Sequence, residues 1–244
     1  MAEMYGEINI YTLNRATTKT TIWQGYSYEA MRHITGKQER PLTCYVEDDG
    51  AEEIIGRVAG ELRLRRFLSL GRYGPAGNAF SLGAGLCLSL NSTENTLVVL
   101  DGDVYGNQSE RKKHVNSAMT GNQPEHDQQR KTLMRLVRAL APFSDESGKP
   151  LSPEQVLHRM LHSLDRESVS EAWREILDIA ISIENVPEKH GFVDHIIEHT
   201  GESRQVALSK IVELASLSAR WPKYTRVVRK WFKSRKATLV LAAP

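Results

Sequence analysis

The sequence predicts an α/β fold in which a small parallel sheet is flanked by helices, with a β-hairpin before it and a helical region after it. Two short apolar runs, at 44–46 and 96–100, end abruptly in carboxylates, as buried strands of a parallel sheet often do. Between these runs, apolar residues recur at the 3, 4 and 7 spacing of a helix. The residues from Gly191 onward follow helical patterns.

Composition allows one large domain, or one domain with an appendage, because the chain has 244 residues of which 40% are apolar. No stretch reaches the roughly 18 apolar residues of a membrane span, and residues 1–7 lack the pattern of a secretory signal. Cys44 and Cys87 both lie in apolar runs, so we expect buried thiols in a reducing compartment, with no disulfide or zinc site. These features favour a cytoplasmic protein without membrane contact.

Residues 1–40 are interpreted as an N-terminal extension. The segments 8–14 and 19–24 alternate and are rich in β-branched residues, which predicts a hairpin. Ser27 to Ile34 predicts a short helix. Because so small a hairpin is not stable alone, we expect it to pack on the main domain or to be the end of a larger domain missing here.

Residues 41–190 are expected to form the main domain. Strands and helices alternate along its first part, and right-handed crossovers between such strands give a parallel sheet. The Gly-rich segment 71–78 lacks a phosphate-binding motif, so we interpret it as a tight structural turn. The expected elements are a strand at 43–47, a helix at 51–64, a strand at 67–70, a helix at 79–90 and a strand at 96–100.

The residues after the third strand read mostly as loop and helix. The polar segment 102–130 predicts a long surface loop with some helix. His158 and His162 share one helix face, and we interpret them as solvent-exposed side chains, not metal ligands. Further helices are expected at 130–141, at 152–164 with Ser152 and Pro153 at its start, and over most of the C-terminal region 191–244. Another is expected to start at Ser168 or Ser170 and to run into 181–185.

Four carboxylates follow the first and third strands, namely Glu47, Asp48, Asp101 and Asp103. Functional residues of open parallel sheets gather at the carboxyl ends of the strands, so neighbouring strands would bring these side chains into one crevice. Carboxylates this close repel one another, and a hard divalent cation with oxygen ligands removes the repulsion. The sequence therefore predicts a magnesium or manganese site. Read alone, Asp101-Gly102-Asp103 is also a common turn sequence in which the glycine supplies a positive φ.

This arrangement of strands and acidic residues resembles the Toprim fold, the metal-binding domain of topoisomerases, primases and several nucleases. Within that fold, residues 41–190 look most like the overcoming-lysogenization-defect (OLD) family. The family's three motifs, Asp/Glu-x-x-x-Glu, Asp-x-Asp and Ser-x-Glu, match Asp48 to Glu52, Asp101 to Asp103, and Ser182 to Glu184 in that order.

The chain departs from the family pattern in two ways. The first strand is followed by Glu47-Asp48-Asp49-Gly50 instead of Glu-Gly, so either Glu47 or Asp48 is the first ligand. OLD proteins also carry an ABC-type ATPase ahead of the Toprim unit, and no Walker A motif is present here. We therefore expect a C-terminal part of such a protein, or a standalone nuclease subunit whose ATPase acts in trans.

The resemblance implies a divalent-metal-dependent endonuclease that hydrolyses DNA with two Mg²⁺ or Mn²⁺ ions, as the effector of an anti-phage defence system working with an ABC-type ATPase. A basic residue of the C-terminal helices, Lys210 or Lys223, would offset charge in the transition state. On spacing alone, Ser182 and Glu184 fit an ordinary helix-end serine and a surface glutamate equally well. The implied ligands are Glu47 or Asp48 with Glu52, Asp101 and Asp103 for one ion, and Asp101, Ser182 and Glu184 for the second.

Residues 220–236 contain eight Lys or Arg residues and no acidic residue. Such a run is most often a solvated helix face, and the interleaved aromatic residues at helical spacing read as core, so no base stacking is predicted. Eight uncompensated charges would nonetheless bind phosphates in a salt-sensitive way, which favours contact with DNA. The residues are Arg220, Lys223, Arg226, Arg229, Lys230, Lys233, Arg235 and Lys236.

Other functions fit parts of the same pattern. A primase would add a zinc module that two cysteines cannot form, and no tyrosine stands out as that of a topoisomerase. A receiver-like phosphoacceptor domain would need further strands after Asp103. A non-catalytic nucleic-acid-binding or ATPase-docking subunit with a degenerate acidic site is the main alternative, and it predicts no divalent ion at Asp101. A homo-oligomer is compatible with every one of these readings.

Overall fold

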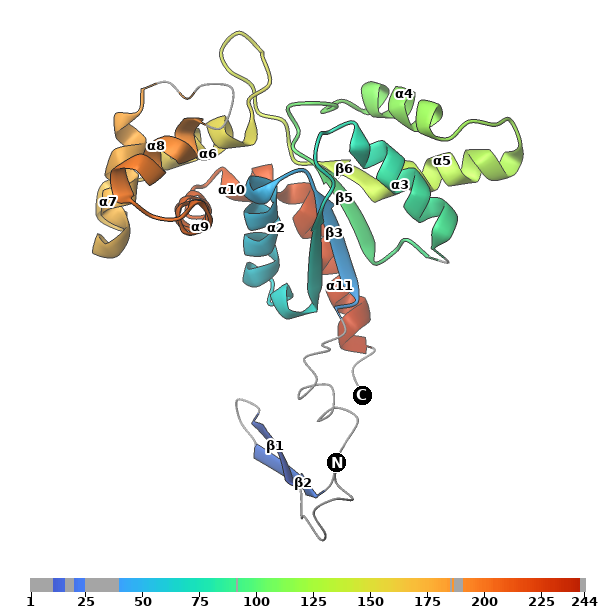
Figure 1. The fold of residues 1–244 in the computed structure, drawn as a ribbon, viewed down its shortest axis with the longest axis horizontal. Coiled ribbons are helices and arrows are strands. Elements are labelled where there is room, and N and C mark those ends of the chain that lie inside the picture. Colours follow the sequence, from blue (N-terminus) through green and yellow to red (C-terminus); the bar gives the residue numbers. More distant parts are fainter. Residues whose placement is uncertain are drawn as a thin grey trace. The chain divides into compact units, whose positions relative to one another are not determined.

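The computed structural model describes residues 11–15, 20–24, 40–90, 92–184, 186 and 191–241. The chain divides into two compact units, Met1–Arg40 and Pro41–Pro244. In the first unit, β1 (Tyr11–Arg15) pairs antiparallel with β2 (Thr20–Gln24), in agreement with the predicted hairpin (Figure 1). The helix expected at Ser27–Ile34 lies outside the described residues.

A parallel sheet of four strands, in the order β4-β3-β5-β6, is the centre of the second unit (Figure 1). Its central strands are the most apolar, because both of their faces are covered. The α/β fold with a small parallel sheet flanked by helices is therefore confirmed. The strands are β3 (Leu42–Val46), β4 (Leu68–Arg72), β5 (Thr96–Leu100) and β6 (Val137–Ala139).

Alternate residues of β5 enter two different hydrophobic cores, because successive side chains of a strand point to opposite faces. Leu97 and Val99 belong to a core shared with α2 (Asp49–Glu61) and the C-terminal helices. Val98 and Leu100 belong to a core shared with α3 (Asn78–Ser89), α4 (Gln108–Ala118) and α5 (Pro124–Leu136). The sheet is thus the middle of three layers. Among the thiols, Cys44 is buried in β3 as predicted, whereas Cys87 is only half-buried, so the prediction of a buried thiol is wrong there.

The helices α2 (Asp49–Glu61) and α3 (Asn78–Ser89) follow β3 and β4. α2 begins where it does because Asp48 caps it, with Oδ1 accepting a hydrogen bond from the Ala51 amide at 2.8 Å. The Gly-rich segment before α3 is a turn in which Gly74 has a φ of 74°, a conformation that favours glycine.

The segment after β5 differs from the prediction. The expected long loop with some helix is mostly helical, with α4 (Gln108–Ala118) and α5 (Pro124–Leu136). The predicted helix at 130–141 is confirmed for 130–136, the end of α5, and wrong from Val137 onward, where the chain becomes extended. α4 escapes sequence detection because Val115 is its one buried residue. β6 is only three residues long, and it extends the sheet beyond the three strands that were expected.

The C-terminal half of the unit is helical, as predicted. In Figure 1, α6 to α9 lie together beside α2, and α11 lies behind the sheet. None of the helices in the described part of the chain is long and apolar enough to cross a membrane. The helices are α6 (Pro153–His162), α7 (Glu171–Ser182), α8 (Gly191–Thr200), α9 (Arg204–Ala215), α10 (Trp221–Tyr224) and α11 (Arg226–Leu241).

The histidines of α6 are not both solvent-exposed. His158 is only 8% exposed, and its Nε2 lies 2.8 Å from the carbonyl oxygen of Ile183 and 2.9 Å from Nε2 of His162. Its ring also packs edge-on against Phe192. The prediction of two solvent-side histidines is therefore wrong for His158, which instead ties α6 to the end of α7 and to α8.

Candidate metal centre

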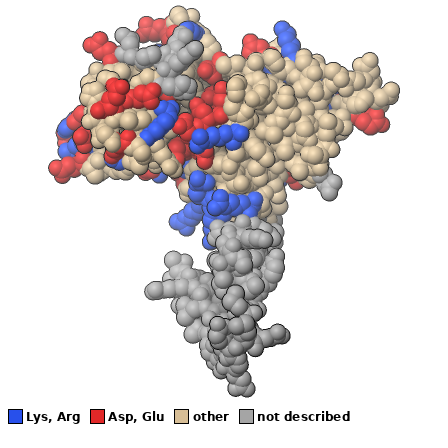
Figure 2. Space-filling model, in the orientation of Figure 1, with Lys and Arg blue, Asp and Glu red and all other residues tan. Residues whose placement is uncertain are grey.

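The strand register brings the acidic residues of two neighbouring strands to one edge of the sheet. Tyr45 of β3 lies opposite Val98 of β5 in parallel pairing. Three residues further along both strands, this register makes Asp48 level with Asp101. On the face drawn in Figure 2, acidic side chains gather over the middle and the α6–α9 side of the unit, while the surface over α3 to α5 carries few charges.

Asp101 is the least compensated of these side chains. Its Oδ1 atom is buried and has no hydrogen-bond partner in the described structure. Burial raises the pKa of the Asp101 carboxyl well above its ordinary value, and the nearby charges of Asp48, Glu47 and Asp103 raise it further. Glu47, Asp48 and Asp103 therefore act on Asp101 electrostatically, and we call these four residues the carboxylate cluster.

The Asp-Gly-Asp segment is both a glycine turn and a source of carboxylates. Gly102 has a φ of 96°, and a Cβ at this position would lie 2.7 Å from the carbonyl oxygen of Leu140. Asp103 Oδ1 accepts a hydrogen bond from the Val104 amide at 2.8 Å. The turn fixes the direction in which Asp101 and Asp103 leave the strand, so the two interpretations of this segment are compatible.

Glu52 lies on α2 beside a cation that the sequence analysis did not select. Nε of Arg72, the last residue of β4, donates a hydrogen bond to Glu52 Oε2 at 2.7 Å. This hydrogen bond raises the pKa of Arg72, and the charges of Asp49 and Asp48 contribute to the same effect. Arg72 therefore lies at the same edge of the sheet as the carboxylate cluster. Its position at a strand end was visible in the sequence, but no motif marked it.

Two tyrosine hydroxyls near the carboxylate cluster were also missed. Tyr73 donates a hydrogen bond to the carbonyl oxygen of Val99 at 2.8 Å, whereas the buried hydroxyl of Tyr224 has no partner in the described structure. Burial raises the pKa of both phenols, and Asp101 is the charge that raises each of them most. Nothing in the sequence indicated that Tyr224, far along the chain, lies near Asp101.

Ser182 and Glu184 lie at the end of α7 and are exposed. The Ser182 hydroxyl donates to the Ile179 carbonyl oxygen at 2.7 Å, a bond typical of a serine at a helix end. No contact in the described part of the chain joins either residue to the carboxylate cluster.

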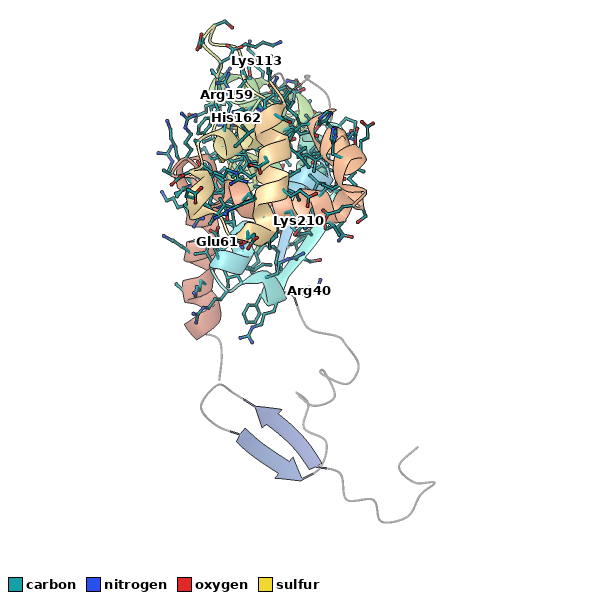
Figure 3. All side chains as sticks on the ribbon, turned by 90° about the vertical axis from the view of Figure 1, so that its left-hand side faces the viewer. Arg40, Glu61, Lys113, Arg159, His162 and Lys210 are labelled. Atoms are coloured by element: carbon teal, nitrogen blue, oxygen red, sulfur yellow. The ribbon has the colours of Figure 1, made fainter. Side chains whose placement is uncertain are left out.

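The two lysines suggested as catalytic cations have other partners. Lys210 of α9, labelled in Figure 3, forms an ion pair with Glu202, and its Nζ lies 5.9 Å from the centre of the Trp173 ring. Lys223 Nζ lies 5.5 Å from the centre of the Phe143 ring. The charges that shift the pKa of Asp101 come from carboxylates and not from these lysines.

The basic residues of 220–236 fall into two groups. Some are tied to the protein: Arg229 forms an ion pair with Glu61, Arg235 pairs with Glu94 at 3.3 Å, and Lys236 donates to the Leu62 carbonyl oxygen at 3.0 Å. The exposed side chains are Arg220, Lys223, Arg226, Lys230 and Lys233.

The donor chemistry of the carboxylate cluster fits a hard divalent cation. All of its ligand atoms would be carboxylate oxygens, which Mg²⁺ and Mn²⁺ prefer. No group of three or more Asp, Glu, His or Cys side chains within the described ranges already has the spacing of a metal site. The buried, unpaired oxygen of Asp101 is nevertheless an atom that a cation would satisfy, so the residues fit such an ion although the cluster is not closed around one point.

Comparison with known proteins gives structural neighbours but no sequence match. No protein-family model matches the chain, and no curated protein matches it. The C-terminal region of the Xanthomonas campestris pv. campestris OLD protein has a TM-score of 0.44 at 13% identity, covering 81% of this chain and 96% of that one. The C-terminal region of the Burkholderia pseudomallei OLD protein has a TM-score of 0.41 at 15% identity, covering 80% and 98%. Both neighbours are C-terminal regions of OLD proteins.

Proposed function

We propose that this protein is a divalent-metal-dependent nuclease that hydrolyses phosphodiester bonds of DNA. The observation that carries the proposal is the buried, unpaired Oδ1 of Asp101, surrounded by the charges of Glu47, Asp48 and Asp103. A protein does not keep such a group without cost, because a buried carboxylate needs a compensating partner. A divalent cation is a partner that all four residues can share.

The carboxylate cluster would hold the first ion, with Asp101 as its central ligand. Asp101 would share a second ion with Ser182 and Glu184, as the family resemblance implies. Bound Mg²⁺ or Mn²⁺ would supply an activated water and Lewis-acid stabilisation of the leaving oxygen. The exposed guanidinium of Arg72, at the same edge of the sheet, offers a positive charge for the phosphate group.

The OLD-like motifs further support a role beside an ABC-type ATPase, in cis or in trans, in anti-phage defence. One observation favours the alternative of a non-catalytic nucleic-acid-binding or ATPase-docking subunit. Glu52, a ligand in the family pattern, is paired with Arg72 in this chain. A degenerate site of that kind would bind no divalent ion at Asp101, which separates the two functions experimentally.

The experiment is cleavage of supercoiled plasmid with Mg²⁺, Mn²⁺ or EDTA by the full chain and two matched variants. Asp101→Ala removes the central carboxylate, and Glu146→Ala removes an exposed carboxylate elsewhere. We expect nicking that needs the metal, is lost in Asp101→Ala and persists in Glu146→Ala. Cleavage that survives Asp101→Ala would overturn the site. Absence of both cleavage and metal binding would favour the non-catalytic subunit.

A further inference from the structure

A hollow of about 960 Å³ lies between α11, the end of α5 with β6, and the segment that leads into β5. Thr96, the first residue of β5, lines it, so the hollow lies at the opposite end of this strand from Asp101. It is therefore separate from the carboxylate cluster. Five cationic side chains from two parts of the chain line it, and we call it the basic hollow: Arg135, Arg138, Arg226, Lys230 and Arg235.

The charges around the basic hollow are poorly balanced. Its one acidic residue, Glu94, pairs with Arg235. The four remaining cations, Arg135, Arg138, Arg226 and Lys230, are exposed and form no ion pair with a described residue. The Arg138 side chain donates to the Arg135 carbonyl oxygen at 3.0 Å, which fixes it beside the preceding helix. Several like charges around one hollow repel each other, and an anion bound among them relieves that repulsion.

The helix α11 presents two different faces. Arg229 and Lys236 contact α2 and its C-terminal end through Glu61 and the Leu62 carbonyl oxygen, so they stabilise the fold. Arg226 and Lys230 are one helical turn apart and line the basic hollow, together with Val227 and the half-buried Trp231. The face toward the hollow thus combines free cations with an apolar and aromatic surface.

We propose that the basic hollow binds a nucleotide, with its phosphate on Arg135, Arg138, Arg226 and Lys230 and its ring against Trp231. Its volume falls at the upper end of the roughly 300–1,000 Å³ of small-ligand sites. Cations beside an aromatic side chain are the combination by which proteins hold nucleotides of a single strand. Either a free nucleotide or one unit of a single-stranded nucleic acid supplies this chemistry. The site does not depend on the proposed nuclease activity.

The test measures binding of a short fluorescein-labelled oligothymidylate to the full chain by fluorescence anisotropy in EDTA, so that the carboxylate cluster holds no metal. Arg135→Gln with Arg138→Gln removes two charges of the hollow, and Lys112→Gln with Lys113→Gln removes two exposed charges of α4. We expect the first pair to weaken binding by about tenfold or more and the second by less than about twofold. Loss of two phosphate contacts lowers the slope of log affinity against log salt by about 1.4.

Two further arms complete the experiment. Unlabelled ligands are then tested for displacement of the labelled oligothymidylate. If ATP or deoxyadenosine monophosphate displaces it at concentrations far below those at which inorganic phosphate does, the natural ligand is a free nucleotide. If the unlabelled oligonucleotide displaces it and these mononucleotides do not, the natural ligand is a single strand. Trp231→Met is expected to weaken binding without changing the salt slope, because it removes ring contact and no charge. The proposal is overturned if neither the oligothymidylate nor a mononucleotide binds, or if inorganic phosphate displaces the oligothymidylate as well as a nucleotide does. It is also overturned if the variant with Lys112→Gln and Lys113→Gln loses as much affinity as the variant with Arg135→Gln and Arg138→Gln.

Discussion

Among single residues, Asp101 is the one on which the proposed metal centre depends most. The Asp101 carboxyl lies near three other carboxylates, and one of its oxygens is buried without a hydrogen-bond partner. We therefore expect this carboxyl to lower the unfolding free energy of the metal-free protein. We expect Asp101→Asn to stabilise the protein in EDTA by about 1–3 kcal/mol at a pH high enough to ionise the Asp101 carboxyl despite its raised pKa, because the substitution removes that charge. Urea unfolding in EDTA and in Mn²⁺ measures this. A variant less stable than the native chain in EDTA would mean that Asp101 already has a partner.

His158 gives a prediction about pH. Burial lowers its pKa below the ordinary 6.5, and His162 lowers it further. The unfolded chain therefore binds more protons than the folded one below about pH 6.5, so stability falls as the pH drops from there toward the folded pKa. We expect His158→Met to lose part of the native difference in unfolding free energy between about pH 7.5 and pH 5.5. The exposed His199→Gln should keep it, and an unchanged difference in His158→Met would contradict the assignment.

At the scale of elements, the turn after β5 sets the direction of two predicted ligands. In Gly102→Ala the new Cβ would meet the Leu140 carbonyl oxygen, in a backbone conformation that favours glycine. We expect a loss of about 2 kcal/mol in unfolding free energy and weaker Mn²⁺ binding. Gly148→Ala, at a positive φ with open space around it, is the matched control and should leave Mn²⁺ binding unchanged. Normal metal binding by Gly102→Ala would show that the turn does not position the site.

The start of α6 provides a simpler element to test. The Ser152 hydroxyl accepts from the Gln155 amide, and the Gln155 side chain accepts in turn from the Ser152 amide at 3.0 Å. Ser152→Ala removes this reciprocal cap and should reduce the unfolding free energy by about 1 kcal/mol. Ser152→Thr, which keeps a hydroxyl, should recover most of the loss. Equal losses in the two variants would argue against the cap.

The elements that were predicted correctly are those whose local pattern agrees with the fold. β3 and β5 are short apolar runs that end in carboxylates, and α2 repeats its apolar residues at the spacing of a helix, so each is visible in the sequence without its neighbours. β6 was missed because the strand has only three residues, Val137–Ala139, and follows directly on the helix α5. α4 was missed because a polar helix with one buried residue reads as a loop.

At the scale of the whole second unit, β5 separates two charged regions. The carboxylate cluster lies at its carboxyl end, and the basic hollow begins at its amino end. The cluster could be predicted from sequence, because parallel strands place their carboxyl ends at one edge. The hollow, Arg72 and Tyr224 could not be predicted, because they depend on contacts between segments far apart in the chain. The basic run at 220–236 indicated phosphate binding but did not distinguish Arg226 and Lys230 from Arg229, which is paired with Glu61.

Calorimetric titration of the full chain with Mn²⁺ tests directly whether Asp101 is the centre of a metal site. Native protein, Asp101→Asn and the surface control Glu146→Gln would be compared, with Glu184→Gln as a probe of the second ion. We expect binding by the native chain and by the control, no binding by Asp101→Asn, and fewer ions per chain in Glu184→Gln. Equal binding by Asp101→Asn, or none by the native chain, would contradict a metal centre at the carboxyl ends of β3 and β5.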